Sequence, residues 1–102
     1  MGVTGYIIVT LQLEREGDQW VGRCIELGTA TCGDTLDETL EALREAVLLH
    51  LNTLEDVGEC RRFLTEHGIR FYGRRPATAP RQPLNLLKDE VFIDKRLVPV
   101  LC

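Results

Sequence analysis

Residues 24–40 read CIELGTATCGDTLDETL, and this stretch decides the fold of the 102-residue chain. Thr35 and Glu38 stand at capping-box spacing, in which the Thr35 hydroxyl accepts from the Glu38 amide while the Glu38 carboxylate reaches back to Thr35. Asp37 joins Glu38 in the first turn, where the helix dipole favours carboxylates. The stretch therefore predicts two short strands with a tight glycine connection, leading directly into a helix.

The helix is expected over residues 35–57, with Gly58 as its left-handed cap. Its apolar residues recur every three or four positions and predict one continuous core stripe: Leu36, Leu40, Leu43, Val47, Leu51 and Leu54. Leu49, with the neighbouring alanines, widens this apolar face. A second, shorter helix is expected over 59–67, closed by Gly68.

Alternating β-branched and polar residues predict the strands. Residues 6–14 and 19–25 flank the turn signal at 16–18, which indicates a hairpin. A third strand is expected over 29–32, and 69–72 is expected to be an edge strand. The fold class is thus α+β, with the order β-β-β-α-(α)-β and an antiparallel sheet packed on one long helix.

The C-terminal part of the chain has a different composition. Three prolines within residues 73–83 predict an extended linker, so residues 1–72 are interpreted as the domain and 73–102 as linker and β-prone tail. The apolar tail residues must be buried on their own sheet or on a neighbouring subunit. We expect them to cross between subunits of a homodimer or higher even oligomer: Val91, Phe92, Ile93, Leu97 and Val98.

The charge is unevenly distributed. Residues 1–60 carry twelve acidic and three basic side chains, a net charge of −9, whereas residues 61–81 carry six arginines and one glutamate, a net charge of +5. An acidic body of this kind favours a basic protein partner or self-association. No apolar run approaches the roughly 18 residues of a membrane span, so we expect a cytoplasmic protein without membrane contact.

Few residues have the spacing that catalysis or metal binding requires. Cys24, Cys32, Cys60 and Cys102 form no C-x-x-C pair and are expected to be free thiols, with a disulfide or metal site as the alternative. His50 is expected to pack beside the helix stripe. We therefore expect neither a catalytic residue, nor a metal, nor a cofactor, and we do not expect an enzyme.

The basic segment offers an alternative activity. Its arginines could bind phosphate groups, with Phe71 and Tyr72 as stacking surfaces for bases. The tentative nucleic-acid contacts are Arg61, Arg62, Arg70, Arg74 and Arg75.

The chain resembles the HicB family of antitoxins over residues 6–72. The resemblance is carried by the turn 26–28, the junction Gly33-Asp34-Thr35 and the helix from Glu38 to Leu51. It implies a partial ribonuclease H fold without catalytic residues. It also implies binding of a small basic RNA-cleaving toxin of the HicA type.

The first hypothesis is that this antitoxin-like domain neutralises such a toxin through an acidic surface. The tentative toxin contacts are Glu26, Asp37, Glu41 and Glu45. The alternative is an oligomeric scaffold or regulator without a toxin. Residues 73–102 are too short and proline-rich for the DNA-binding module that many members carry, so DNA binding is doubtful.

Overall fold

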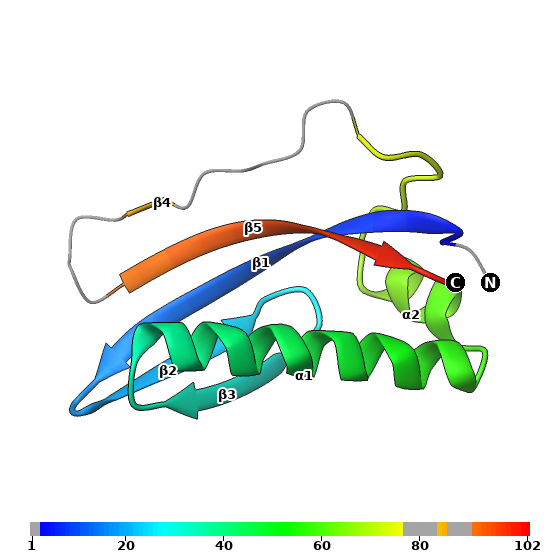
Figure 1. Ribbon diagram of the computed structural model, residues 1–102. Helices are drawn as coiled ribbons and strands as arrows, with labels where there is room; N and C mark the ends of the chain where they lie inside the picture. Colours follow the sequence, from blue (N-terminus) through cyan, green and yellow to red (C-terminus); the bar gives the residue numbers. More distant parts are fainter. Residues whose placement is uncertain (1–2, 77–83, 86–90) are drawn as a thin grey trace.

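The computed structural model describes residues 3–76, 84–85 and 91–102. Its elements are β1 (Gly5–Glu16), β2 (Gln19–Cys24), β3 (Thr29–Gly33), α1 (Leu36–Asp56), α2 (Cys60–Glu66), β4 (Leu84–Asn85) and β5 (Val91–Val100). The strands form one antiparallel sheet in the order β3-β2-β1-β5-β4 (Figure 1). The α+β class, the hairpin and the third strand are confirmed.

Helix α1 begins and ends where its sequence signals indicate. The Thr35 hydroxyl accepts from the Glu38 amide at 3.1 Å, which is one half of the expected capping box. At the other end Gly58 has a φ of +74°, in the left-handed region that glycine enters at little cost. The second helix is α2, and Gly68 follows it with a φ of +66°.

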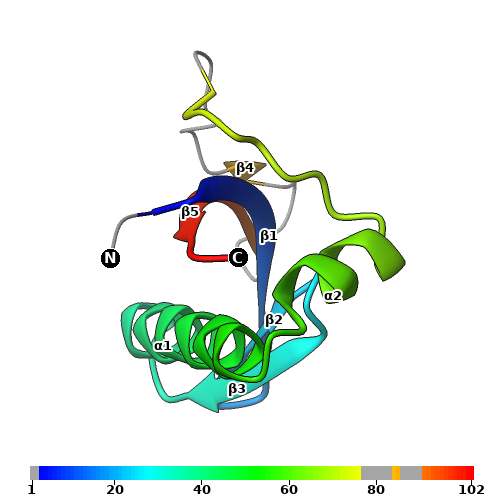
Figure 2. The same ribbon diagram turned by 90° about the vertical axis from the view of Figure 1, so that its right-hand side faces the viewer.

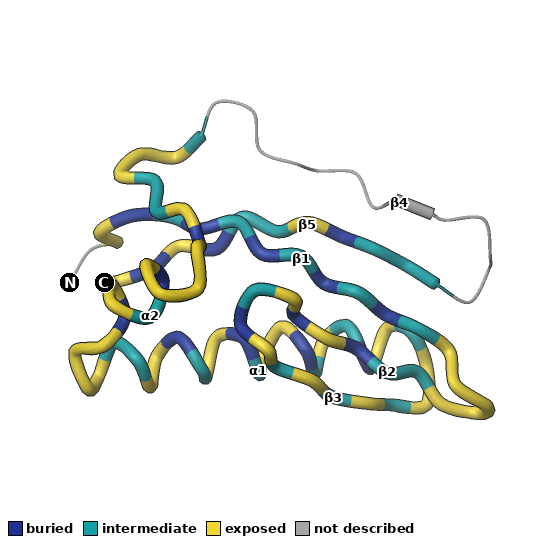
Figure 3. The backbone as a smooth tube through the Cα atoms, turned by 180° about the vertical axis from the view of Figure 1, so that it is seen from behind, coloured by how far each residue is buried: buried dark blue, intermediate teal, exposed yellow. Residues whose placement is uncertain are grey.

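The core lies between one face of the sheet and α1. In β1 every second side chain points toward the helix layer and is buried: Ile7, Val9, Leu11 and Leu13. From α1 the buried side chains are Thr39, Leu43, Val47 and Leu51. Buried side chains that recur every two residues in β1 and every three to four residues in α1 thus pack together in one apolar layer. Figure 2 shows α1 lying along one side of the sheet, and Figure 3 shows its buried and exposed residues alternating.

Two glycines let α1 approach the strands closely. A Cβ on Gly33 would lie 2.7 Å from Thr39 Oγ1, and a Cβ on Gly22 would lie 3.2 Å from both Thr39 and Leu43. Thr39 is fully buried, and its hydroxyl donates to the Thr35 carbonyl at 2.7 Å. Gly33 in the Gly33-Asp34-Thr35 junction is therefore required by the packing of the first helical turn.

The C-terminal segment differs from the expected extended tail. Residues 91–100 form β5, which pairs with β1 over its whole length, from Gly5 opposite Val100 to Glu14 opposite Val91. Of the two alternatives that the sequence left open, the chain buries this segment on its own sheet. The linker residues 77–83 lie outside the described residues.

Two further expectations are wrong. The expected edge strand at 69–72 is reduced to one bridge, in which Tyr6 and Tyr72 exchange two backbone hydrogen bonds of 2.8 Å. Leu49 does not widen the core face, because it is 67% exposed. Its position on the helix points away from the sheet, on the solvent side of the stripe.

The cysteines also differ in part from the expected four free thiols. Cys60 and Cys102 form a disulfide that joins the start of α2 to the second residue after β5, with Cα atoms 5.3 Å apart. Cys24 is a buried free thiol and Cys32 an exposed one. Spacing alone missed the pair because the two cysteines are 42 residues apart and meet only once β5 has paired with β1.

Candidate functional site

Three of the four predicted toxin contacts lie together on α1. Asp37, Glu41 and Glu45 are separated by four residues each, so they follow one another along an exposed side of the helix. Glu41 contacts Arg44 at 3.7 Å, and both side chains are about half exposed or more, so this pair contributes little to stability. These three carboxylates remain available to a partner.

Two exposed leucines continue this side of the helix. Leu48 and Leu49 are 49% and 67% exposed and lie one turn beyond Glu45. We call the set of Asp37, Glu41, Glu45, Leu48 and Leu49 the acidic surface of α1. Apolar side chains next to charge are typical of protein contact surfaces. Both leucines look like a continuation of the apolar stripe, so the sequence pattern does not mark them as exposed.

Glu26, the fourth predicted toxin contact, does not join this surface. Its carboxylate accepts hydrogen bonds from the Thr10 amide at 2.6 Å and from the Thr10 hydroxyl at 2.8 Å. Thr10 alternates with the buried residues of β1 and so points to the sheet face opposite α1. The structure therefore gives Glu26 a local role in the sheet.

The arginine segment is largely engaged within the chain. The Arg61 guanidinium lies 3.9 Å from the centre of the Phe71 ring, and that of Arg70 lies 4.9 Å from the Tyr72 ring. Such stacking stabilises an arginine without neutralising it. Phe71 also packs on Gly5, where an added Cβ would lie 2.2 Å from the ring. Phe71 is thus half-buried, and the contacts with Arg61 and Gly5 leave its ring only partly available for stacking a base.

The other three arginines differ in their surroundings. Arg62 contacts Glu59 at 3.1 Å and Glu66 at 3.2 Å. The hydrogen bond to Glu66, and then the charges of both glutamates, raise the pKa of Arg62. Arg74 and Arg75 are exposed and have no ion pair within the described ranges. Arg61 and Arg70 are likewise exposed and without an ion pair there, and their stacking leaves their charge available to phosphate.

The residues expected to join subunits have mixed surroundings. Val98 is buried in the core of its own chain, and Val91, Phe92, Ile93 and Leu97 are half-buried on β5. Their strand pairs with β1 of the same chain. The homo-oligomer stays a prediction.

Both histidines make contacts within the fold. His50 Nδ1 lies 3.2 Å from the Thr29 hydroxyl, and its ring meets Phe63 edge-on at 5.3 Å. His67 stacks on the same Phe63 at 3.9 Å and contacts its carbonyl. No cluster of three metal-ligating side chains occurs within residues 3–76, 84–85 and 91–102. In the same part of the chain, no helix is long and apolar enough to cross a membrane.

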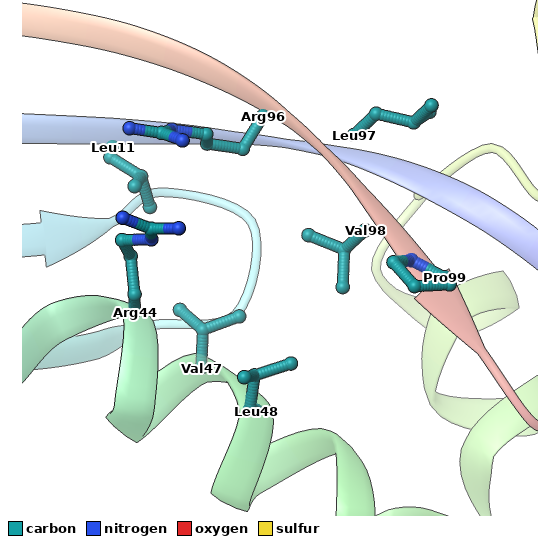
Figure 4. Close-up of a pocket in the computed structure, with 8 residues that line it drawn as sticks. All are labelled: Leu11, Arg44, Val47, Leu48, Arg96, Leu97, Val98 and Pro99. Atoms are coloured by element: carbon teal, nitrogen blue, oxygen red, sulfur yellow. The ribbon is translucent and has the colours of Figure 1, made fainter. Parts of the chain in front are cut away.

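A groove opens where α1 diverges from the sheet. The helix packs on β3, β2 and β1, and a cavity of about 200 Å³ remains between it and β5 (Figure 4). We call it the α1–β5 groove. Its lining residues are Leu11, Arg44, Val47, Leu48, Arg96, Leu97, Val98 and Pro99.

Comparison with known proteins gives no further assignment. No family model matches the chain, and searches of curated proteins and of solved structures return no match. The candidate sites therefore rest on the geometry described above.

Proposed function

We propose that the chain is a HicB-like binding protein that neutralises a small basic toxin of the RNA-cleaving HicA type through the acidic surface of α1. In this proposal the chain acts by binding and not by catalysis, and it works in the cytoplasm. The partial ribonuclease H-like fold is part of the same proposal. The observation that carries it is the row of exposed carboxylates at Asp37, Glu41 and Glu45, continued by exposed leucines.

Residues that carry the family resemblance pack together at the start of α1, and this packing supports the proposal. Gly33 lies against Thr39, and Thr35 caps α1. Thr39 stands where the family commonly has alanine. Its buried hydroxyl donates to the Thr35 carbonyl, so this departure is compatible with the same helix start.

Charge supports a basic partner. The net charge of residues 1–60 is −9, and a field of one sign steers an oppositely charged partner and raises the association rate. The leucines would add apolar contacts that exclude water and slow the dissociation of such a complex. A rim of charge around an apolar centre is the usual anatomy of a transient interface.

Co-expression with the product of the neighbouring reading frame tests the proposal. We expect the neighbour to arrest growth alone, to be rescued by this chain and to copurify with it. The double charge reversal E41K/E45K should abolish rescue. The control E16K/D18K reverses two exposed carboxylates at the β1–β2 turn and should rescue normally.

Two results would overturn the proposal. One is the absence of both a toxic neighbour and a small basic copurifying protein. The other is rescue by E41K/E45K that equals rescue by the control, because the acidic surface would then play no part. Light scattering on the purified chain separately tests the expected homodimer or higher even oligomer.

Nucleic-acid binding is a weaker candidate for this chain. Phe71 is half-buried and contacts Arg61 and Gly5, and Arg62 is paired with two glutamates. Within the described part of residues 61–81, the exposed arginines without an ion pair are Arg61, Arg70, Arg74 and Arg75. Four phosphate contacts at most predict a shallower salt dependence than that of proteins with roughly 6–10 such contacts. Titration with RNA and DNA at two salt concentrations measures that slope.

A further inference from the structure

The inner face of β5 carries two charged residues where a core strand normally carries apolar ones. Every second residue of β5 shares the side of the buried β1 residues, because Asp94 pairs with Leu11, Arg96 with Val9 and Val98 with Ile7. Asp94 is only 6% exposed. A buried carboxylate is costly unless a charged partner compensates it. The presence of Asp94 and Arg96 on the core-facing side of β5 therefore needs an explanation.

Arg96 supplies the compensation and is held in place by it. Its Nε donates to Asp94 Oδ2 at 2.6 Å, and its side chain is 36% exposed. A guanidinium has five N–H donors in a fixed fork. Because Nε is used by Asp94, the terminal nitrogens of Arg96 keep donors for another acceptor. Asp94 thus acts as a positioning residue for Arg96.

A second arginine enters the same groove from the helix. Arg44 lines the cavity together with Arg96, and Figure 4 shows both guanidinium groups at the Leu11 end of the groove. Its contact with Glu41 is 3.7 Å long and largely exposed. Each guanidinium contacts one carboxylate, Glu41 for Arg44 and Asp94 for Arg96, and keeps further N–H donors for an anion placed between the two. Paired guanidiniums are suited to carboxylates, which they bind by two parallel hydrogen bonds.

The rest of the groove is apolar and small. Val47, Leu48 and Val98 line the end away from the guanidiniums (Figure 4). The cavity volume of about 200 Å³ lies below the roughly 300–1,000 Å³ typical of small-molecule sites. It suits one apolar side chain and an adjacent carboxylate, which is the size of an anchor within a peptide segment.

We infer that the α1–β5 groove binds a partner protein segment in which an apolar side chain neighbours a carboxylate. The carboxylate lies between Arg44 and Arg96, and the apolar side chain lies against Leu48 and Val98. The acidic surface on the adjacent side of α1 disfavours segments with further negative charge. The groove therefore selects a single acidic anchor. This inference does not rest on the proposed toxin, because the carboxylate is bound by Arg44 and Arg96, and Leu48 is the residue that the groove shares with the acidic surface of α1.

A pair of probe peptides tests the inference on the full chain, labelled with ¹⁵N for NMR. The probes are acetyl-Ala-Leu-Glu-Leu-Ala-amide and the same peptide with Gln in place of Glu. We expect the glutamate peptide to shift the amide signals of Val47, Leu48 and Val98. We expect it to bind with a dissociation constant near 1 mM or lower, about tenfold tighter than the glutamine peptide.

Two arginine variants and one control complete the test. Arg44→Gln removes a groove donor at an exposed helix position and should weaken glutamate-peptide binding about tenfold. Arg96→Gln should also weaken glutamate-peptide binding, but it leaves Asp94 without its ion-pair partner. If Arg96→Gln does not fold, the result for Arg44→Gln decides the test. Arg23→Gln removes an exposed arginine on the opposite sheet face and should leave binding unchanged.

The inference is overturned if the two peptides bind equally, or if the shifts spread elsewhere and omit the groove. It is also overturned if Arg44→Gln binds the glutamate peptide as tightly as Arg23→Gln does. Failure of toxin rescue by E41K/E45K leaves these peptide results unaffected, so the two proposals fail separately.

Discussion

The carboxylate of Glu26 takes the place of a strand residue opposite Thr10. The β1–β2 ladder ends at Leu11 opposite Cys24, and the next backbone contact is a single hydrogen bond from the Ile25 amide to the Thr10 carbonyl. Glu26 then accepts from both the amide and the hydroxyl of Thr10. A side chain thereby extends the pairing of β1 beyond the point where the backbone of β2 turns away.

Replacing Glu26 should therefore cost stability. We expect Glu26→Ala to lower the free energy of unfolding by about 1.5–3 kcal/mol, the range for hydrogen bonds to a charged group. The control Glu45→Ala removes an exposed carboxylate on α1 and should stay within about 0.5 kcal/mol of the parent. Urea unfolding followed by circular dichroism measures both. Equal stabilities for the two variants would contradict the role given to Glu26.

Gly33→Ala tests the close approach of β3 to α1. The new Cβ would lie 2.7 Å from Thr39 Oγ1 and 3.3 Å from the Thr39 backbone nitrogen, so we expect a loss of about 1–3 kcal/mol. Thr39→Ala removes the nearer atom and should restore part of that loss in the double variant. A double-mutant cycle measures this coupling. Strictly additive effects would show that the two residues do not compete for the same space.

Removing the disulfide should destabilise the chain substantially. Cys60 and Cys102 are 42 residues apart, and the loop-entropy relation gives about 4 kcal/mol for a loop of that length. We expect the variant C60S/C102S to lose about that amount in denaturant unfolding. The control Cys32→Ser changes an exposed free thiol and should be nearly neutral. Equal unfolding midpoints for the parent with and without reductant would contradict the bond.

The two free thiols should react at very different rates. Burial raises the pKa of the Cys24 thiol above its usual 9.0, so the native thiol stays protonated and unreactive. Without reductant, we expect iodoacetamide to label one cysteine, Cys32, in the native protein and two in denaturant, counted by mass spectrometry. Because the folded pKa is raised, the stability that Cys24 contributes is present below about pH 9 and is lost as the pH rises further. Native labelling of Cys24 would contradict its burial.

Local signals predicted the local elements well. Thr35, Gly58 and the leucine repeat mark the ends and the core face of α1, because capping and periodicity act within a few residues. The hairpin is similarly determined by the turn at Gly17, whose φ is +65°. These features are confirmed because neighbours in the chain decide them.

The remaining features depend on contacts between distant residues. The partner of residues 91–100 is β1, more than 80 positions away in the chain for most pairs, and no local pattern specifies it. The disulfide and the α1–β5 groove both follow from that pairing. Glu26 illustrates the same limit, since its sequence position suggests an exposed turn and its hydrogen bonds come from another strand.

The pairing of β1 with β5 has a consequence for synthesis on the ribosome. Of the strands in this sheet, β1 is synthesised first and β5 last, yet the two are neighbours. One edge of β1, with apolar side chains on both of its faces, stays without its partner strand until residue 100 has been translated. The nascent chain therefore presents a strand edge throughout its own translation, and such edges pair readily with other chains. Any protein that contacts the chain before that point meets an incomplete sheet.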